Sequence, residues 1–240
     1  MRLVLFDIDG TMLRSGGVGR VSMESALMEV FGAPGSPDYH YDGKTDRQIA
    51  RELMRLEGFT VQEIDAQMDA VMDAYLETLR RELSSGRRTV HVLDGVVELL
   101  DELDREEEVV VGLLTGNIEA GARAKLEAAG IDIARFRANA FGSDHEHRPE
   151  LPAVARQRAR DLLGEREGEG EGGGAEFNGN RMIVIGDTPA DIKCGESIGA
   201  RAIGVATGRY TVEQLSEHEP YAVFATLADT EAVMQRIMNA

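Results

Sequence analysis

The sequence predicts an α/β protein whose parallel sheet is interrupted by an all-helical insert. From Asp94 onward, short apolar segments alternate with amphipathic segments, a pattern typical of parallel strands covered by helices on both faces. Residues 15–88 show helical periodicity alone. We therefore expect one domain formed by residues 1–14 and 89–240, and a second, helical domain formed by residues 15–88.

The N-terminal region is predicted to contain one strand followed by three helices. Arg2–Phe6 is an apolar run of strand length that ends at Asp7. The glycine-rich residues Ser15 to Gly19 form a linker, and Ser84-Ser85-Gly86 ends the helical pattern. The predicted helices are Val18–Phe31, Thr45–Leu56 and Thr60–Leu83.

The C-terminal region is predicted to alternate between helices and strands. Gly130 follows the end of one helix, and Pro149 stands in the first turn of the next, where its missing N–H costs nothing. Gly164 to Asn180 is of low complexity and is predicted to be a surface loop. In chain order we expect helix Gly95–Arg105, strand Glu108–Leu114, helices Ile118–Ala129 and Pro149–Leu163, strand Arg181–Ile185, helix Pro189–Ile198, strand Ala202–Val205 and helix Leu227–Met238.

Composition excludes several classes of function. The formal net charge of −17 argues against a nucleic-acid partner, whose phosphates would be repelled. No apolar run approaches the length of roughly 18 residues that a membrane span requires, so we expect no membrane partner. An apolar strand follows Met1 at once and Cys194 is the single cysteine, so we expect no signal peptide, no disulfide framework and a cytoplasmic location. The sequence indicates no oligomeric state, and a monomer is compatible with it.

Polar groups follow three of the predicted strands, at the point where each strand ends. These groups are Asp7 and Asp9, the segment Thr115-Gly116-Asn117, and Asp187 with Asp191. Ligands of open parallel sheets bind at this edge, and the hydroxyl, amide and exposed N–H groups of the second segment suit phosphate oxygens.

Each segment taken singly is equally compatible with a turn or a helix N-cap. Together, carboxylates that converge at one edge would repel one another without a cation, and carboxylate oxygens favour Mg²⁺.

At these residues the chain resembles the haloacid dehalogenase-like superfamily, in particular its phosphoglycolate phosphatase and beta-phosphoglucomutase-like branch with a helical cap of the first type. The order Asp-x-Asp-Gly-Thr, Thr-Gly-Asn, basic residue, Gly-Asp-Thr-x-x-Asp carries the resemblance. It implies a Rossmann-like core, Asp7 as nucleophile and Asp9 as general acid and then base. It also implies Mg²⁺ held by the Asp7 carboxylate, the Asp9 backbone carbonyl and Asp187, with Thr115 binding the phosphoryl group.

The basic residue departs from the family pattern, which usually has lysine there. Lys44, Lys125 and Lys193 all lie outside the interval between the Thr-Gly-Asn and Gly-Asp segments. We assign the position to Arg148, because an arginine stays charged and can grip a phosphate through two N–H groups. Asp191 is then expected to pair with Arg148 or to hold a metal-bound water.

These features predict a Mg²⁺-dependent phosphomonoesterase of a small phosphorylated metabolite, such as phosphoglycolate or a sugar phosphate. Asp9 favours a phosphatase because a dehalogenase needs no second acid. A phosphomutase would use the same residues, and a phospho-accepting signalling domain is a third possibility.

Each of two further segments can be interpreted in two ways. Lys44 lies in the turn Asp42 to Asp46, which is either a plain interhelical turn or, as its resemblance to the substrate-contacting cap loop of the same family branch implies, a loop whose lysine contacts the anionic end of the substrate. Asp144-His145-Glu146-His147 has metal-binding residue types, but we interpret it as a polar loop, because zinc sites draw ligands from more than one segment.

Overall fold

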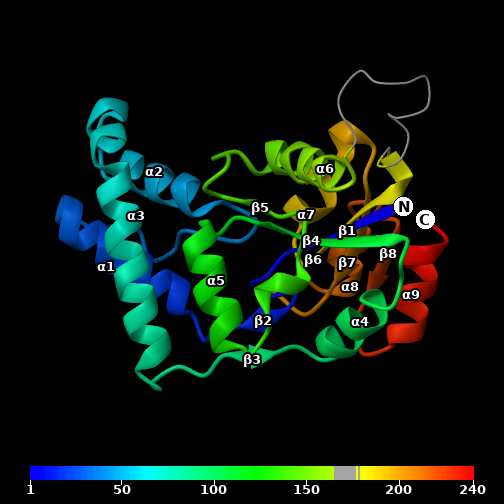
Figure 1. Ribbon diagram of the computed structural model, residues 1–240. Coiled ribbons are helices and arrows are strands. Elements are labelled where there is room, and N and C mark those ends of the chain that lie inside the picture. The colour runs from blue at the N-terminus through cyan, green and yellow to red at the C-terminus, as the bar shows by residue number, and fades with distance from the viewer. Residues whose placement is uncertain (165–176, 178) are drawn as a thin grey trace.

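A six-stranded sheet, in which every pair of neighbouring strands is parallel, forms the centre of the computed structural model (Figure 1). The structure describes residues 1–164, 177 and 179–240, so most of the predicted loop 164–180 lies outside the described residues. In spatial order the strands are β5 (Ala140–Phe141), β4 (Val109–Thr115), β1 (Arg2–Phe6), β6 (Met182–Gly186), β7 (Arg201–Val205) and β8 (Ala222–Phe224).

Helices cover both faces of this sheet, which confirms the predicted fold class. Alternate residues of β1 point to opposite faces, as the pleat requires: Val4 and Phe6 join one apolar cluster, and Leu3 and Leu5 another. The first cluster contains residues of α4 (Val96–Leu103), α5 (Glu119–Ala128) and α9 (Thr230–Met238). The opposite face is covered by α6 (Leu151–Leu162), α7 (Pro189–Cys194) and α8 (Val212–Ser216).

Three helices of the insert pack around an apolar cluster of their own. They are α1 (Val18–Phe31), α2 (Asp46–Leu56) and α3 (Val61–Ser84), and Figure 1 shows them to one side of the sheet, next to α5. Thr60 begins α3 with a capping box, in which its side chain accepts a hydrogen bond from Glu63 N–H. Ile118 of the core belongs to the same cluster, so the helical unit shares apolar packing with the sheet domain. The predicted boundaries at 14/15 and 88/89 remain a prediction.

The two chain crossings between core and insert pair with each other. β2 (Leu13–Arg14) and β3 (His91–Val92) form a two-stranded antiparallel sheet. This ladder fixes the entry and exit of the helical unit relative to the core.

Several elements differ from the sequence-based expectation. The strands β2, β3, β5 and β8 were not predicted, because two or three residues carry no periodic pattern. The helix α8 was not predicted either, because its five residues make little more than one turn. The helix predicted over Pro189–Ile198 ends at Cys194, and a separate 3-10 turn spans Glu196–Ile198. The last helix begins at Thr230, because the Asp229 side chain caps Ala232 N–H. Among the described helices, none is both long enough and apolar enough to cross a bilayer.

Candidate active site

The register of the sheet brings the three predicted segments together. Phe6 of β1 lies beside Leu113 of β4 and Ile185 of β6. The residues that follow these three therefore emerge side by side at the carboxyl edge, and Asp7 N donates to Ile185 O over 2.9 Å.

Asp7, Asp187 and Asp191 form a buried cluster of carboxylates at this edge. Their relative exposures are 7%, 4% and 1%, and one oxygen of each lies within 4.8 Å of the others. Burial is the main cause that raises the pKa of Asp7 to about 6. Burial also raises the pKa of Asp187 well above its ordinary value, with further contributions from Asp191 and Asp7. The three groups thus repel one another in a poorly solvated space.

Arg148 supplies positive charge to this cluster. It lies in the 3-10 turn Arg148–Glu150 before α6, is buried, and places Nη2 3.2 Å from Asp7 Oδ1. The same nitrogen contacts Asp191 Oδ1 and donates to Leu114 O over 3.2 Å. Burial disfavours the charged guanidinium, but Asp191 and Asp7 more than offset this and raise the pKa of Arg148. The arginine therefore stays charged.

Asp191 is directed at Arg148 by its own hydrogen bonds. Its Oδ2 accepts from Thr188 N over 2.9 Å and from Thr188 Oγ1 over 2.6 Å, which forms the capping box of α7. Its Oδ1 is then left for Arg148. Of the two roles expected for Asp191, this geometry favours pairing with the arginine.

Thr115 is the last residue of β4, and Gly116 and Asn117 begin the turn that follows it. Asn117 Nδ2 donates to Thr115 Oγ1 and to Asp9 Oδ2, each over 2.8 Å. A side chain at position 116 would place its Cβ 2.0 Å from Lys44 O, so glycine is needed for the insert to approach this turn. The turn thus contacts both the carboxylate edge and the insert.

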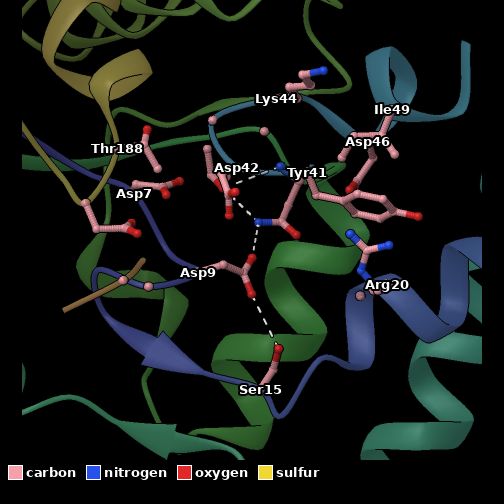
Figure 2. A pocket seen from close by; sticks show the side chains of 18 of the residues that line it. Asp7, Asp9, Ser15, Arg20, Tyr41, Asp42, Lys44, Asp46, Ile49 and Thr188 are labelled. Atoms are coloured by element: carbon pink, nitrogen blue, oxygen red, sulfur yellow. Dashed lines mark hydrogen bonds between the residues drawn. The ribbon is translucent and has the colours of Figure 1, made fainter. Parts of the chain in front are cut away.

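Asp9 lies further out than Asp7, and its side chain is 40% exposed. Figure 2 shows its carboxylate between the edge of the sheet and Ser15, whose Oγ is 3.4 Å from Oδ1. Oδ2 receives Asn117 Nδ2 and also Lys125 Nζ, the latter over 2.6 Å.

Sequence reasoning did not assign Lys125 to the site. Lys125 belongs to α5, and its side chain is 4% exposed. A signal was present: Lys125 follows Ala122 by three residues and precedes Leu126, and both neighbours lie on the buried face of the helix. A lysine on that face requires a buried acceptor.

A cavity of about 530 Å³ lies between this edge and the helical insert. Asp7, Asp9 and Thr115 line it from the core, and Arg20 and Tyr41 line it from the insert (Figure 2). Arg20, another residue not predicted, places its guanidinium carbon 4.1 Å from the centre of the Tyr41 ring.

Asp46 connects the insert to the turn after β4. Its N–H donates to Gly116 O, and its Oδ2 accepts from Ile118 N, each over 2.8 Å. Burial raises the pKa of Asp46 to about 6, against the opposing effects of Lys125 and the Ile118 N–H. These two hydrogen bonds therefore hold the insert against the core.

Lys44 lines the cavity, but its ammonium group is engaged elsewhere. Nζ lies 2.7 Å from Glu52 Oε2 and 4.0 Å from the centre of the Tyr39 ring. Figure 2 shows the side chain directed away from Asp7 and Asp9. Contact between Lys44 and substrate therefore stays a prediction.

The loop Asp144 to His147 makes ion pairs with neighbouring helices. Asp144 accepts two hydrogen bonds from Arg158, over 2.7 and 2.8 Å. Glu146 accepts two from Arg51 of α2, over 2.5 and 3.0 Å. Within the described residues, the one cluster of three or more side chains that could ligate a metal ion consists of Asp7, Asp187 and Asp191. These contacts agree with the polar-loop interpretation.

The carboxylate edge fits a hard divalent cation. Three buried carboxylates share the single guanidinium of Arg148, which leaves an excess of negative charge. Asp187 is enclosed by backbone, because a Cβ at Gly10 or Gly208 would lie 2.4 or 1.7 Å from its Oδ2. Thr11 Oγ1 donates to the other oxygen of Asp187 over 2.9 Å. Oxygen donors held in this way suit Mg²⁺.

Comparisons with known proteins show which family the chain resembles. Residues 4–196 match the model of the haloacid dehalogenase-like hydrolase family. The chain is 25% identical to "Probable phosphatase IndB" of Dickeya dadantii (strain 3937) over 241 residues, which covers 99% of this chain and 95% of that protein.

Two solved structures share the fold over nearly the whole chain. "Putative beta-phosphoglucomutase from Bacteroides vulgatus" has a TM-score of 0.67 at 20% identity, and the match covers 100% of this chain and 89% of that one. A predicted phosphoglycolate phosphatase from Haemophilus somnus 129pt has a TM-score of 0.67 at 19% identity, over 98% of each chain. The prediction from the sequence motifs is confirmed: the chain belongs to the haloacid dehalogenase-like hydrolase family.

Proposed function

We propose that this enzyme is a Mg²⁺-dependent phosphomonoesterase that hydrolyses a small phosphorylated metabolite through an aspartyl phosphate on Asp7. One observation carries the proposal. Asp7 and Asp187 meet Arg148 and Thr115 at a single sheet edge, and that edge opens into a cavity which Asp9 also lines. This set matches the requirements of in-line phosphoryl transfer: a nucleophile, charge compensation for the phosphoryl oxygens and a proton donor.

In the first half-reaction, an oxygen of Asp7 attacks phosphorus while the bond from phosphorus to the leaving oxygen breaks. Asp9 donates a proton to that oxygen, and the product leaves as an alcohol. Thr115, Gly116, Asn117 and Arg148 bind the transferring phosphoryl group.

In the second half-reaction, Asp9 accepts a proton from a water that attacks the phosphorus of the aspartyl phosphate. The bond from phosphorus to the Asp7 oxygen breaks, phosphate leaves, and the Asp7 carboxylate is restored. Splitting the hydrolysis in this way replaces one difficult displacement by two easier ones.

The Asp7 carboxylate, the Asp9 backbone carbonyl and Asp187 would hold the Mg²⁺, while Asp191 fixes Arg148. Bound Mg²⁺ offsets the negative charge of the carboxylates and of the phosphoryl oxygens. Burial and mutual repulsion raise the pKa values of Asp7 and Asp187 and so disfavour their ionised forms. A bound cation would favour the ionised forms, which supports a cation at this position.

The helical unit of residues 15–88 acts as a cap that covers the site and limits the size of the substrate. The volume of about 530 Å³ suits a small metabolite rather than a polymer. The relatives whose names refer to phosphoglycolate phosphatase and beta-phosphoglucomutase support phosphoglycolate or a sugar phosphate as the substrate class. Lys44 remains the proposed contact for an anionic group of the substrate that lies away from the reacting phosphate. To make this contact, Lys44 would have to break its ion pair with Glu52.

A phosphomutase is the second candidate, because one structural relative carries that name. A mutase would return the phosphoryl group of Asp7 to a sugar and would depend on a sugar bisphosphate. A signalling domain that stores phosphate on Asp7 is a weaker candidate, since Asp9 beside a covered cavity favours turnover. The predicted cytoplasmic location and the absence of a nucleic-acid partner remain predictions.

The test is release of inorganic phosphate from a panel of small phosphomonoesters, including phosphoglycolate and sugar phosphates. We expect release with Mg²⁺, loss of release with EDTA and recovery when Mg²⁺ is restored. The Asp7→Asn variant should be inactive on every substrate. If the folded protein releases no phosphate but interconverts sugar monophosphates when a sugar bisphosphate is present, the mutase is correct. If a stable phosphoprotein accumulates without release, the signalling domain is correct.

A further inference from the structure

Lys125 is a buried lysine that belongs to none of the motifs. Its side chain is 4% exposed, although it belongs to a core helix and lines the cavity. Holding an ammonium group in such a place costs free energy unless acceptors surround it. Its acceptors therefore indicate what it does.

Nζ of Lys125 contacts two acceptors over the same short distance. It donates to Asp9 Oδ2 and to Asn117 Oδ1, each over 2.6 Å. Asn117 Nδ2 in turn donates to the same Asp9 oxygen over 2.8 Å. The three side chains thus form a closed set of hydrogen bonds in which Asp9 Oδ2 receives two donors.

The first cap helix comes close to the same ammonium group. A Cβ added to Gly19 of α1 would lie 3.5 Å from Lys125 Nζ and 3.8 Å from the hydroxyl of Tyr75 on α3. Lys125 therefore occupies the space between the first and third cap helices and Asp9. Its position depends on the cap being seated on the core.

We propose that Lys125 is a positioning residue, which fixes the carboxyl group of Asp9 for proton transfer when the cap covers the site. This inference rests on the proposed role of Asp9 as general acid and base. The Asp9 side chain is 40% exposed, and among the described residues the one side-chain hydrogen bond to its remaining oxygen comes from Ser15 Oγ over 3.4 Å. Without Lys125 the carboxyl group would rotate more freely, and misplacement of about 1 Å can cost 10²-fold in rate.

Lys125 itself neither loses nor gains a proton in this scheme. The proton passes from Asp9 to the leaving oxygen as the bond from that oxygen to phosphorus breaks. Lys125 acts through Asp9, so its contribution should exist only where Asp9 contributes. That dependence separates a positioning role from a structural one.

The first experiment compares kcat/KM of Lys125→Met on two substrates. An alkyl phosphate has a leaving oxygen that needs a proton, whereas p-nitrophenyl phosphate has one that does not. We expect a loss of about 10- to 100-fold on the alkyl ester and less than about 3-fold on the aryl ester. Lys193→Met, the same change at an exposed lysine of α7, should leave both values unchanged.

The second experiment repeats the change in an Asp9→Asn background. If Lys125 acts through Asp9, adding Lys125→Met to Asp9→Asn should cause no further loss on the alkyl ester. The double variant also removes both charges of the pair, so its folding is less at risk than that of the single variant. Lys125→Gln, which keeps an N–H donor, provides a milder change if Lys125→Met unfolds.

Equal losses on both esters, or an undiminished loss in the Asp9→Asn background, would overturn the positioning role. The proposed function would survive this result, provided that Asp9→Asn alone impairs the alkyl ester more than the aryl ester. If Asp9→Asn shows no such preference, the general-acid role of Asp9 fails, and the inference about Lys125 fails with it.

Discussion

The two sides of the cavity differ in how their charged groups are brought together. On the core side, Asp7, Asp187, Asp191 and Arg148 lie at strand ends or in the turns and short helices next to them. The other side faces the cap and is called the cap side here: the core residue Asp9 meets Lys125 of the core helix α5, and Asp46 and Tyr75 approach from two cap helices. The first set depends on the sheet, whereas the second depends on the docking of the cap.

The charge balance of the two sides differs as well. Three carboxylates share one guanidinium on the core side, and two carboxylates share one ammonium on the cap side. The excess of negative charge on the core side favours a divalent cation, while the cap side is closer to balance. We infer that one side binds metal and phosphoryl group, and the other controls proton transfer and closure.

The largest effect is expected at Arg148. Arg148→Met would leave Asp7 and Asp191 as buried carboxylates without a cationic partner. We expect a loss of about 3–5 kcal/mol in the free energy of unfolding and a fall of at least about 100-fold in kcat/KM. Denaturant unfolding and steady-state kinetics measure the two. Arg148→Lys is the control, because it keeps the charge; a Met variant as stable as the Lys variant would contradict the charge argument.

The second effect concerns metal binding on the same side. Gly208→Ala would place a Cβ 1.7 Å from Asp187 Oδ2 and force that carboxylate to move. The Mg²⁺ concentration for half-maximal activity should rise by about 10- to 100-fold, as when groups that orient a ligand are disturbed. At Gly204 of β7 a Cβ has its nearest neighbour at 3.4 Å, so Gly204→Ala serves as the control. An unchanged Mg²⁺ requirement in Gly208→Ala would speak against Asp187 as a ligand.

A third test concerns the pH dependence of stability on the cap side. Burial raises the pKa of Asp46 from 3.8 to about 6, although Lys125 opposes the shift. Between these pH values the folded protein keeps a proton that the unfolded chain releases, so this contribution to stability falls as pH rises from about 4 to 6. Asp46→Asn removes the titrating group and should be more stable than the wild type at pH 7, by up to about 3 kcal/mol.

The advantage of Asp46→Asn should become small near about pH 3, which lies below the pKa of Asp46 in both the folded and the unfolded state, because the carboxyl group is then mostly neutral in both. Thermal or denaturant unfolding at both pH values measures the difference. Asp73→Asn, at an exposed position of α3, should match the wild type at both. A constant difference between Asp46→Asn and the wild type across this range would show that Asp46 does not titrate as proposed.

The smallest effect is expected at Lys44. Its pair with Glu52 is partly exposed, at 28% and 37%, and such a pair contributes up to about 1 kcal/mol. If Lys44 exchanges Glu52 for substrate, Lys44→Ala should raise KM about 2- to 5-fold for substrates with a second anionic group, with kcat unchanged. Unchanged kinetics would refute this contact. A rise in KM for Arg20→Gln alone would assign it to Arg20 instead.

The sequence predicted the core side of the site more fully than the cap side, for a physical reason. A strand of four or more apolar residues followed by polar ones has a local pattern, so Asp7, Thr115 and Asp187 could be placed at one edge before the structure was known. Helix Val18–Phe31 was predicted at its observed bounds because its ends carry glycine signals. Arg148 was found by its place between two motifs.

The contacts on the cap side could not be predicted from the sequence in the same way. Lys125 reaches Asp9 only because α5 packs on the sheet, where Ala122 and Leu126 join the apolar cluster of one face. The hydrogen bonds that Asp46 donates to Gly116 O and accepts from Ile118 N join segments that are 70 or more residues apart. Lys44 was assigned to the substrate by resemblance, and its pair with Glu52 depends on the packing of α2. Contacts of this kind produce no periodic pattern in the sequence, so they could not be predicted from it.

The central claim is that Asp7 carries the phosphoryl group during turnover. The most direct measurement is rapid acid quenching of the Mg²⁺-loaded enzyme with substrate, then borohydride reduction and mass spectrometry of the tryptic peptide that begins at Leu3 and ends at Arg14. We expect homoserine at position 7, formed by reduction of an aspartyl phosphate, and none in Asp7→Asn or without Mg²⁺. Modification at position 9, or rapid turnover with an unmodified peptide, would contradict the claim.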